Sequence, residues 1–400
     1  IAAAPATAQQ PRAMTIVDLI NVPGVSDPRL SPDGTQLLFT RSGALTTGIG
    51  HAQAFVRSRD GLPAPNLQIA QLNAYGWIVS TRGFNSLFAN KLLVMIDGRA
   101  VYTPLFAGVS WDVQNVLLED IDRIEVIAGP GGTTWGANAV NGVINIITRS
   151  AAETQGLYAS AAAGTALEKR GALRYGGRFG RDLSFRIYAQ HFDRDHTLLS
   201  DGSANADAWR LTHGGFRMDW QPSEADVVTL QGDLHGGTER NAPEASTMNG
   251  QHVLGTWTRF FSPESDLSLH LYADRTWRRD VPSTLTDELT TVDVDFQHRF
   301  PLARRHNLMW GVGLRLMDSY VENATPQVGF VPTGRVMKLF SGFVQDEIAL
   351  AGARVKLIVG TKVEHNDFSG FEVQPSTRLA WTPAPRWRSD AGGSSCYSPV

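Results

Sequence analysis

A period-two alternation of apolar and polar residues recurs from residue 155 to residue 382, and it constrains the fold more than any other feature of the chain. The segments LSFRIYAQ at 183–190, LSLHLYAD at 267–274 and VDVDF at 292–296 all show it. Successive side chains of a β-strand point to opposite faces, so each of these strands has one apolar and one polar face. The region therefore predicts a series of antiparallel strands rather than helices.

The sequence predicts that short turns alternate with longer polar loops between these strands. Short turns are expected at 180–181, 221–226, 262–266, 301–307 and 351–352, and long loops at 195–207, 236–250, 278–287 and 320–335. A soluble sandwich has no reason to separate the two lengths, whereas a membrane barrel has short turns at one end and long loops at the other. Aromatic residues at both ends of the strands agree with the two rings of aromatics that a membrane barrel places at its interfaces: Trp220 and Trp381 lie beside short turns, and Trp277 lies beside a long loop. We expect a transmembrane barrel segment of about twelve strands.

Composition and motifs exclude several function classes. The chain has 400 residues and a formal net charge of −3, which argues against nucleic acid as the main partner. Its single cysteine, Cys396, rules out disulfides and cysteine metal clusters within the chain. No G-x-S-x-G motif of a serine hydrolase occurs. His191 and His196 have no third residue nearby in sequence to complete a metal site, so we expect them to lie in a solvated loop. We expect no catalytic residues, no metal site and no cofactor.

Residues 62 to 150 predict a small α+β domain. Leu92–Ile96 is an apolar strand, Asp97-Gly98 a tight turn, and Val113–Asp122 has helical spacing. The glycine-rich stretch AGPGGTTWGANAVNG at 128–142 follows a strand, but it lacks the lysine and hydroxyl of a P-loop. It is followed by another β-branched strand instead of the helix of a dinucleotide site. The glycines are therefore expected to allow tight turns of the backbone and not to bind a phosphate.

Three motifs in this domain carry a resemblance to a known family. They are APNLQIAQ at 64–71, STRGFNSLFANKLLVMIDGRAVYTPLFAGVSWDV at 80–113 and LLEDIDRIEVIAGPGGTTWGANAVNGVINIITR at 117–149. Together with the alternating region that follows, they resemble the TonB-dependent outer-membrane receptors. The resemblance implies a mainly β protein, in which a small α+β plug domain precedes an incomplete antiparallel transmembrane β-barrel. The expected divisions are a plug at 46–150 and a partial barrel at 151–385.

The resemblance also implies a function and its partners. Such receptors are not enzymes; they bind a scarce, large substrate such as a ferric siderophore or a cobalamin-like ligand from outside. A TonB-type energy transducer then pulls on a segment ahead of the plug, although no transducer box is seen before residue 62. The location implied is the outer membrane of a Gram-negative bacterium, with outer-membrane lipid around the barrel.

Site residues follow from the same resemblance. The expected substrate contacts lie in two plug loops and are Asn85, Ser86, Phe88, Asn90, Tyr102, Leu105, Phe106 and Trp111. Packing of the aromatic members between plug and barrel is the alternative. Arg82 matches a family arginine that pairs with glutamates of the barrel wall, whereas the position of a second such arginine holds Ala128. The turn glycines are Gly129, Gly131, Gly132, Gly136 and Gly142.

The two ends of the chain leave other readings open. Residues 1–45 begin with a signal-like IAAAPATAQQ and contain SPDG before a strand at 36–40, which resembles the start of a prolyl-oligopeptidase-type peptidase. Residues 386–400 abandon the alternation, as a shifted reading frame would. We therefore expect a truncated or hybrid receptor, with a secreted serine peptidase fragment or a nonfunctional hybrid as alternatives. The substrate's identity and the oligomeric state are not encoded in any motif.

Overall fold

The computed structural model describes eleven stretches of the chain. They are residues 25–30, 37–43 and 51–56, for which the backbone alone is described, and 67–81, 91–128, 139, 141–240, 244–281, 285–322, 329–350 and 354–381. The predicted contacts Asn85, Ser86, Phe88 and Asn90, the predicted lock residue Arg82 and the tail 386–400 lie outside the described residues.

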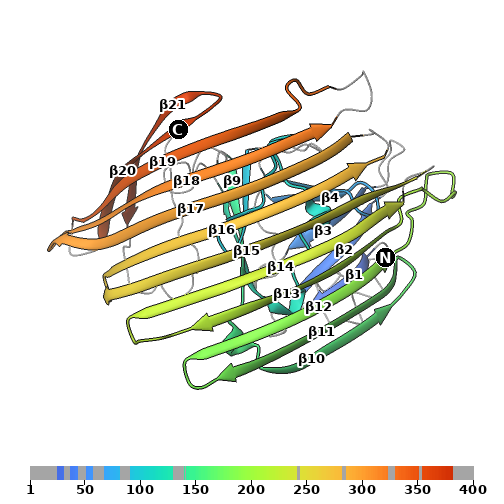
Figure 1. Ribbon diagram of the computed structural model, residues 1–400, viewed down its shortest axis with the longest axis horizontal. Coiled ribbons are helices and arrows are strands. Elements are labelled where there is room, and N and C mark those ends of the chain that lie inside the picture. Colours follow the sequence, from blue (N-terminus) through green and yellow to red (C-terminus); the bar gives the residue numbers. More distant parts are fainter. Residues whose placement is uncertain are drawn as a thin grey trace, which may run out of the picture.

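A single curved sheet of twelve antiparallel strands makes up most of the molecule (Figure 1). Each strand pairs with its neighbour in sequence, and no pairing joins the first to the last in the part of the chain that is described. The open sheet of twelve strands agrees with the expected incomplete barrel. The strands are β10 (Gly156–Ala163), β11 (Leu167–Phe179), β12 (Leu183–Arg194), β13 (Trp209–Trp220), β14 (Asp226–Arg240), β15 (Ala245–Ser262), β16 (Ser265–Asp280), β17 (Leu285–Ala303), β18 (His306–Glu322), β19 (Gly334–Ala349), β20 (Val355–Asn366) and β21 (Gly370–Trp381).

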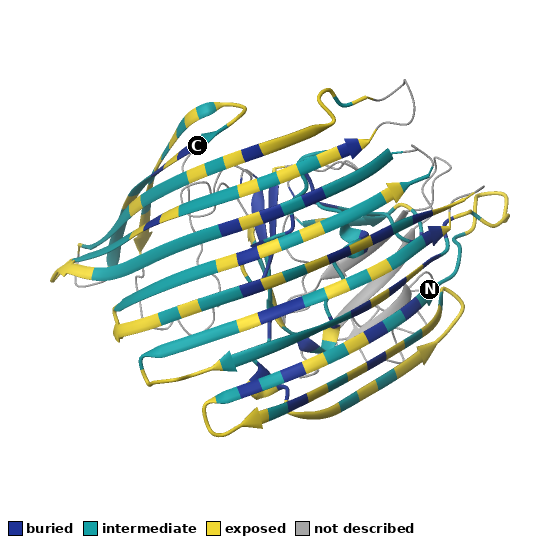
Figure 2. Ribbon diagram, in the orientation of Figure 1, coloured by how far each residue is buried: buried dark blue, intermediate teal, exposed yellow. Residues whose placement is uncertain are grey.

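The two faces of the sheet differ as the alternation requires. On β16, Leu271 is 41% exposed on the convex face, while Tyr272 is 4% exposed on the concave face. The same alternation of buried and exposed positions runs along the other strands and gives the banded pattern of Figure 2. An apolar outer face with a polar inner face is the arrangement that suits a sheet surrounded by lipid.

Two of the long loops expected from the sequence are much shorter in the structure. Strands β14 and β15 pair as far as Arg240 and Ala245, and β16 and β17 as far as Asp280 and Leu285. The expectation of long loops at 236–250 and 278–287 was therefore wrong. Beyond an apolar band, both faces of a strand are polar, so the alternation fades while the backbone ladder continues.

A smaller domain lies on the concave side of this sheet (Figure 1). Its central sheet has the order β7-β6-β9-β8, with β6 and β9 parallel. A second sheet runs in the order β1 to β5. The strands are β1 (Val25–Leu30), β2 (Leu37–Gly43), β3 (His51–Val56), β4 (Leu67–Gln71), β5 (Trp77–Thr81), β6 (Leu92–Ile96), β7 (Arg99–Ala100), β8 (Ile121–Ala128) and β9 (Gly142–Thr148).

The core of the small domain consists of apolar strand residues. Val79, Leu92, Val94, Ile96 and Ile144 are all buried there. Strand β6 is buried along its whole length, as its unbroken apolar run predicted. The packed strand places the turn that follows it directly against the large sheet.

The helix expected over Val113–Asp122 does not form. Two short 3-10 turns, η1 (Trp111–Val113) and η2 (Leu118–Asp120), take its place, and β8 starts at Ile121. The segment runs between the domain core and the large sheet, so it is covered on both sides and not along one helical stripe. A third 3-10 turn, η3 (Ala151–Glu153), leads into β10. None of the described helices is long or apolar enough to cross a membrane.

Candidate functional site

The turn between β6 and β7 fixes the small domain on the large sheet. Asp97 and Gly98 have φ angles of 49° and 86°, the left-handed pair of a tight hairpin turn, as the Asp-Gly dipeptide predicted. The carboxylate of Asp97 accepts hydrogen bonds from the backbone N–H of Thr148 at 2.8 Å and from Gln231 on β14 at 2.9 Å. A Cβ on Gly98 would lie 2.8 Å from Nε2 of His270 on β16, so the turn lies so close to the large sheet that this side chain would have to shift to admit a methyl group.

A set of ion pairs spans the interface. Arg99 of the small domain pairs with Asp274 of β16 at 2.6 Å. The other pairs run in the opposite sense, with carboxylates on the small domain and guanidinium groups on the sheet: Glu119 with Arg170, Asp120 with Arg174 and Arg186, and Asp112 with Arg278. Arginines of the sheet thus supply most of the charge lock seen here, whereas the sequence prediction placed the arginine, Arg82, on the small domain.

Glu119 is held as an anion by its partner. Burial acts to raise the pKa of Glu119, but hydrogen bonds from Arg170, the Glu119 backbone and Tyr158, together with the charge of Arg170, outweigh it, and the pKa lies below its ordinary value. Asp120 is 1% exposed and has two guanidinium partners. The sequence signal for these residues was present in LEDIDRIEV, but nothing in that motif says which strands would carry their partners.

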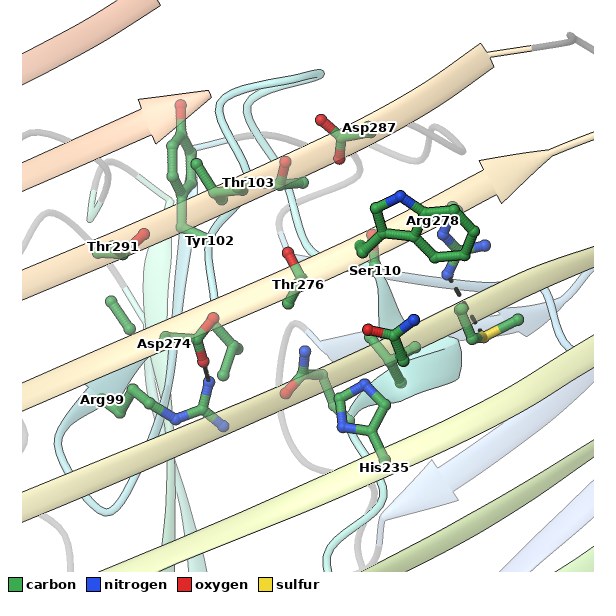
Figure 3. A pocket seen from close by; sticks show the side chains of 18 residues that line it. Arg99, Tyr102, Thr103, Ser110, His235, Asp274, Thr276, Arg278, Asp287 and Thr291 are labelled. Carbon is green, nitrogen blue, oxygen red and sulfur yellow. Dashed lines mark hydrogen bonds and ion pairs between the residues drawn. The ribbon is translucent and has the colours of Figure 1, made fainter. Parts of the chain in front are cut away.

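A cavity of about 60 Å³ lies between the small domain and the sheet, near the ends of β14 to β17 that carry the connections 241–244 and 281–284. The small domain contributes residues of its segment 99–114, including Tyr102, Thr103 and Ser110. The sheet contributes polar side chains from four strands; they are His235, Asn249, Asp274, Thr276, Arg278, Asp287 and Thr291. Figure 3 shows Arg99 and Asp274 joined on one side of this cavity and Arg278 on another.

The structure describes four of the predicted substrate contacts: Tyr102, Leu105, Phe106 and Trp111. Tyr102 lines the cavity, and burial raises its pKa, partly offset by the charge of Arg315, so its hydroxyl is a stable donor at neutral pH. Leu105 and Phe106 are half-buried at the tip of a loop closed by the bridge between Thr103 and Gly108.

Trp111 packs against the core of the small domain, so its ring has a structural contact. Gly142 begins β9, opposite Leu92 and Ala128. The other turn glycines, Gly129, Gly131, Gly132 and Gly136, lie outside the described residues.

A cluster that the sequence reasoning missed lies deeper on the inner face of the sheet. Asp233 of β14 lies 3.1 Å from His213 and 3.1 Å from His252, on the two neighbouring strands. These residues are far apart in sequence and join no motif, so only the strand register brings them together. Within the described residues, no three His, Cys, Asp or Glu side chains are placed to hold a metal ion.

Comparison with known proteins bears on the small domain first. Residues 58–143 match the family model described as TonB-dependent Receptor Plug Domain. We therefore call the small domain the plug and the twelve-stranded sheet the wall. Over 137 residues the chain is 36% identical to the vitamin B12 transporter BtuB of Vibrio vulnificus, a match that covers 31% of this chain and 22% of that protein.

Longer matches include the wall. The chain is 23% identical over 352 residues to an iron-regulated outer membrane virulence protein of Vibrio cholerae, covering 80% of this chain and 51% of that protein. The solved siderophore receptor PirA from Acinetobacter baumannii superposes with a TM-score of 0.62 at 15% identity, over 80% of this chain and 55% of that one. A mutant of the ferric enterobactin receptor PfeA from Pseudomonas aeruginosa superposes with a TM-score of 0.61 at 16% identity, over 80% and 56%.

The chain thus spans about half the length of these longer relatives, and less of the B12 transporter. At such identities the solved structures show a shared fold, which is that of a plug set against the inside of a barrel wall. The names of these similar proteins describe a vitamin B12 transporter, an outer membrane virulence protein and siderophore receptors.

Proposed function

We propose that this chain is a TonB-dependent receptor, or a part of one, that takes up a scarce and large substrate such as a ferric siderophore or a cobalamin across the outer membrane of a Gram-negative bacterium. One observation carries the proposal. The plug is pinned to the concave wall by buried ion pairs, and its segment 99–114 meets β14 to β17 to form a polar cavity at one end of the strands. The names of the similar receptors support the substrate class.

The proposed mechanism needs binding and movement but no covalent chemistry. The cavity end of the strands faces outward, and the substrate rests on the tip of the plug and the wall beside it. A TonB-type transducer in the inner membrane would supply the force that loosens the plug. The ion pairs between plug and wall set the resistance to that force, because each must exchange its partner for water before the plug can move.

The proposal also assigns residues and boundaries. Tyr102, Leu105 and Phe106 are proposed to touch the substrate, together with the loop Asn85–Asn90, and Trp111 to support them from the plug core. The plug is proposed to occupy residues 46–150 and the wall 151–385, with membrane lipid against the apolar convex face. The resemblance of the first segment to a peptidase stays a prediction; its expected strand at 36–40 overlaps β2 (Leu37–Gly43) at residues 37–40.

Binding tests the proposal directly. The detergent-solubilised chain is titrated with ferric siderophores of the catecholate and hydroxamate classes and with cyanocobalamin, and the equilibrium affinity is measured. We expect at least one of these complexes to bind, and Tyr102→Ala to weaken binding about tenfold, because a half-buried aromatic ring with a hydrogen-bond donor is lost from the cavity. Tyr320→Ala, on the convex face and 47% exposed, is the matched control.

Two outcomes would reject the proposal. One is that none of the complexes binds, and the other is that both tyrosine variants weaken binding equally. Uptake of the bound complex by cells, with and without the inner-membrane transducer, then tests the partner.

A further inference from the structure

Among the residues that the structure describes, the lining of the cavity between plug and wall has no free guanidinium or ammonium group. Arg99 is bound to Asp274 at 2.6 Å. Arg278 is shared by two carboxylates, Asp112 of the plug and Glu239 of β14, the latter at 3.5 Å. Each of the two guanidinium groups that line the cavity, those of Arg99 and Arg278, therefore already has a carboxylate partner.

The next guanidinium along the wall is also engaged. Arg315 of β18, whose charge reaches Tyr102, is bound to Asp293 of β17 at 2.7 Å. An anionic ligand entering from the plug tip would therefore meet no unpaired cation among the described residues of this cavity.

Several polar groups of the cavity lining lack a partner in the described part of the chain. Oδ1 of Asp287 on β17, Nε2 of His235 on β14 and Nε of Arg99 are all buried without a hydrogen bond. The Nε–H group of Arg99, a residue that is 7% exposed, is a donor, so it would pair with an acceptor such as the carbonyl oxygen of an amide. A buried polar atom without a partner is costly, and such atoms at a binding site are satisfied when the ligand arrives.

The volume limits what can enter. A cavity of about 60 Å³ holds one small functional group, whereas a whole drug-sized ligand needs roughly 300 Å³ or more. The cavity is thus a subsite for one end of a larger ligand. The rest of that ligand would lie over the loop of Leu105 and Phe106.

We propose that this cavity is a subsite for a cationic or uncharged hydrogen-bond-donating group of the substrate, such as an ammonium, guanidinium or amide, with the Asp287 carboxylate as its acceptor. This rests on the proposed function and narrows it. The receptor would select substrates with such a group and disfavour a ferric tris-catecholate, in which six phenolate oxygens around Fe³⁺ leave three negative charges. Asp287 becomes the residue that sets the charge preference.

Three ferric complexes that differ at one end test the proposal. The probes are the linear ferric trihydroxamate ferrioxamine B, which ends in a free ammonium, its N-acetyl form and its N-succinyl form. The iron centre is the same in all three, and the end group is cationic, neutral or anionic. We expect the detergent-solubilised chain to bind the ammonium form about tenfold more tightly than the acetyl form, and the succinyl form most weakly.

Two neighbouring variants assign the preference to Asp287. Asp287→Asn should remove the advantage of the ammonium form while leaving the acetyl form within about twofold. Glu288→Gln is the matched control, because Glu288 is the next residue of β17 and pairs with Arg275 at 2.6 Å on the exposed side of the sheet. A succinyl form that binds as tightly as the ammonium form would overturn the proposal. So would an unchanged order of affinities in Asp287→Asn.

A second measurement judges the subsite without any iron complex. Met248 lines the cavity, and its ¹³C-labelled methyl resonance, assigned with Met248→Leu, reports on small probes. Methylguanidinium should shift this resonance saturably and acetate should not, and Asp287→Asn should abolish the shift. If no ferric complex binds but methylguanidinium does, the ferric-substrate part of the proposed function fails and the subsite stands. If acetate binds instead, or neither probe does, the subsite proposal is wrong.

Discussion

Replacing Asp120 by asparagine should loosen the plug from the wall. This carboxylate lies in η2 of the plug, is 1% exposed, and is bound by Arg174 of β11 and Arg186 of β12. Asparagine keeps the shape of the side chain but removes its charge. Two buried guanidinium groups would then face an amide that cannot balance either of them.

The free-energy cost of Asp120→Asn depends on the hydrogen bonds that its arginine partners keep. Breaking a buried ion pair by removing one partner costs about 3–5 kcal/mol. Arg186 would still donate to the backbone oxygen of Arg149 at 2.6 Å and to Oγ1 of Thr148 at 3.1 Å. We therefore expect the lower end, about 3 kcal/mol, which corresponds to a change of roughly a hundredfold in the opening equilibrium of the plug.

Hydrogen exchange of the buried plug strands β6 and β9 measures this opening. Their amides should exchange about a hundredfold faster in Asp120→Asn. Asp122→Asn is the control, because Asp122 pairs with Arg123 at 2.7 Å in a pair whose side chains are 42% and 54% exposed. That pair should be worth about 1 kcal/mol or less, so the control should change exchange by about fivefold at most. Equal effects of the two variants would refute the argument that burial makes the Asp120 contacts strong.

Three further changes test other parts of the structure. Leu269→Arg, on the convex face of β16, should cost about 2–4 kcal/mol of folding free energy in lipid, measured by unfolding from vesicles; no loss would contradict a lipid-facing surface. Gly98→Ala should destabilise plug docking by more than Gly156→Ala in the same exchange assay. Both have φ near +85°, at 86° and 84°, but only the first would push a Cβ into a wall histidine. The contribution of Glu119 to docking should be present above its ordinary pKa of 4.5 and be lost as the pH falls through its lowered value. Glu119→Gln should flatten this acid dependence, and an unchanged dependence would show that other carboxylates carry it.

The sequence predicted the wall better than the plug. Alternation between outward-facing and inward-facing positions is a local property of each strand, so LSLHLYAD and similar segments were sufficient to predict antiparallel strands and their faces. The helix expected over Val113–Asp122 was wrong because the segment is buried from two sides at once. The loops at 236–250 and 278–287 were too long because strand pairing continues where the side-chain pattern stops.

Sequence alone also determined the Asp97-Gly98 turn and the plug resemblance, since both depend on residues close together in the chain. It could not determine the charge lock or the cavity. Asp112 and Arg278 are 166 positions apart, and Arg99 and Asp274 are 175 apart. Which strand of the wall faces which turn of the plug depends on sheet curvature and register, and no short stretch of sequence specifies these. Only the tertiary structure decided that the guanidinium groups of the cavity are already paired, and therefore which charge a ligand group must carry.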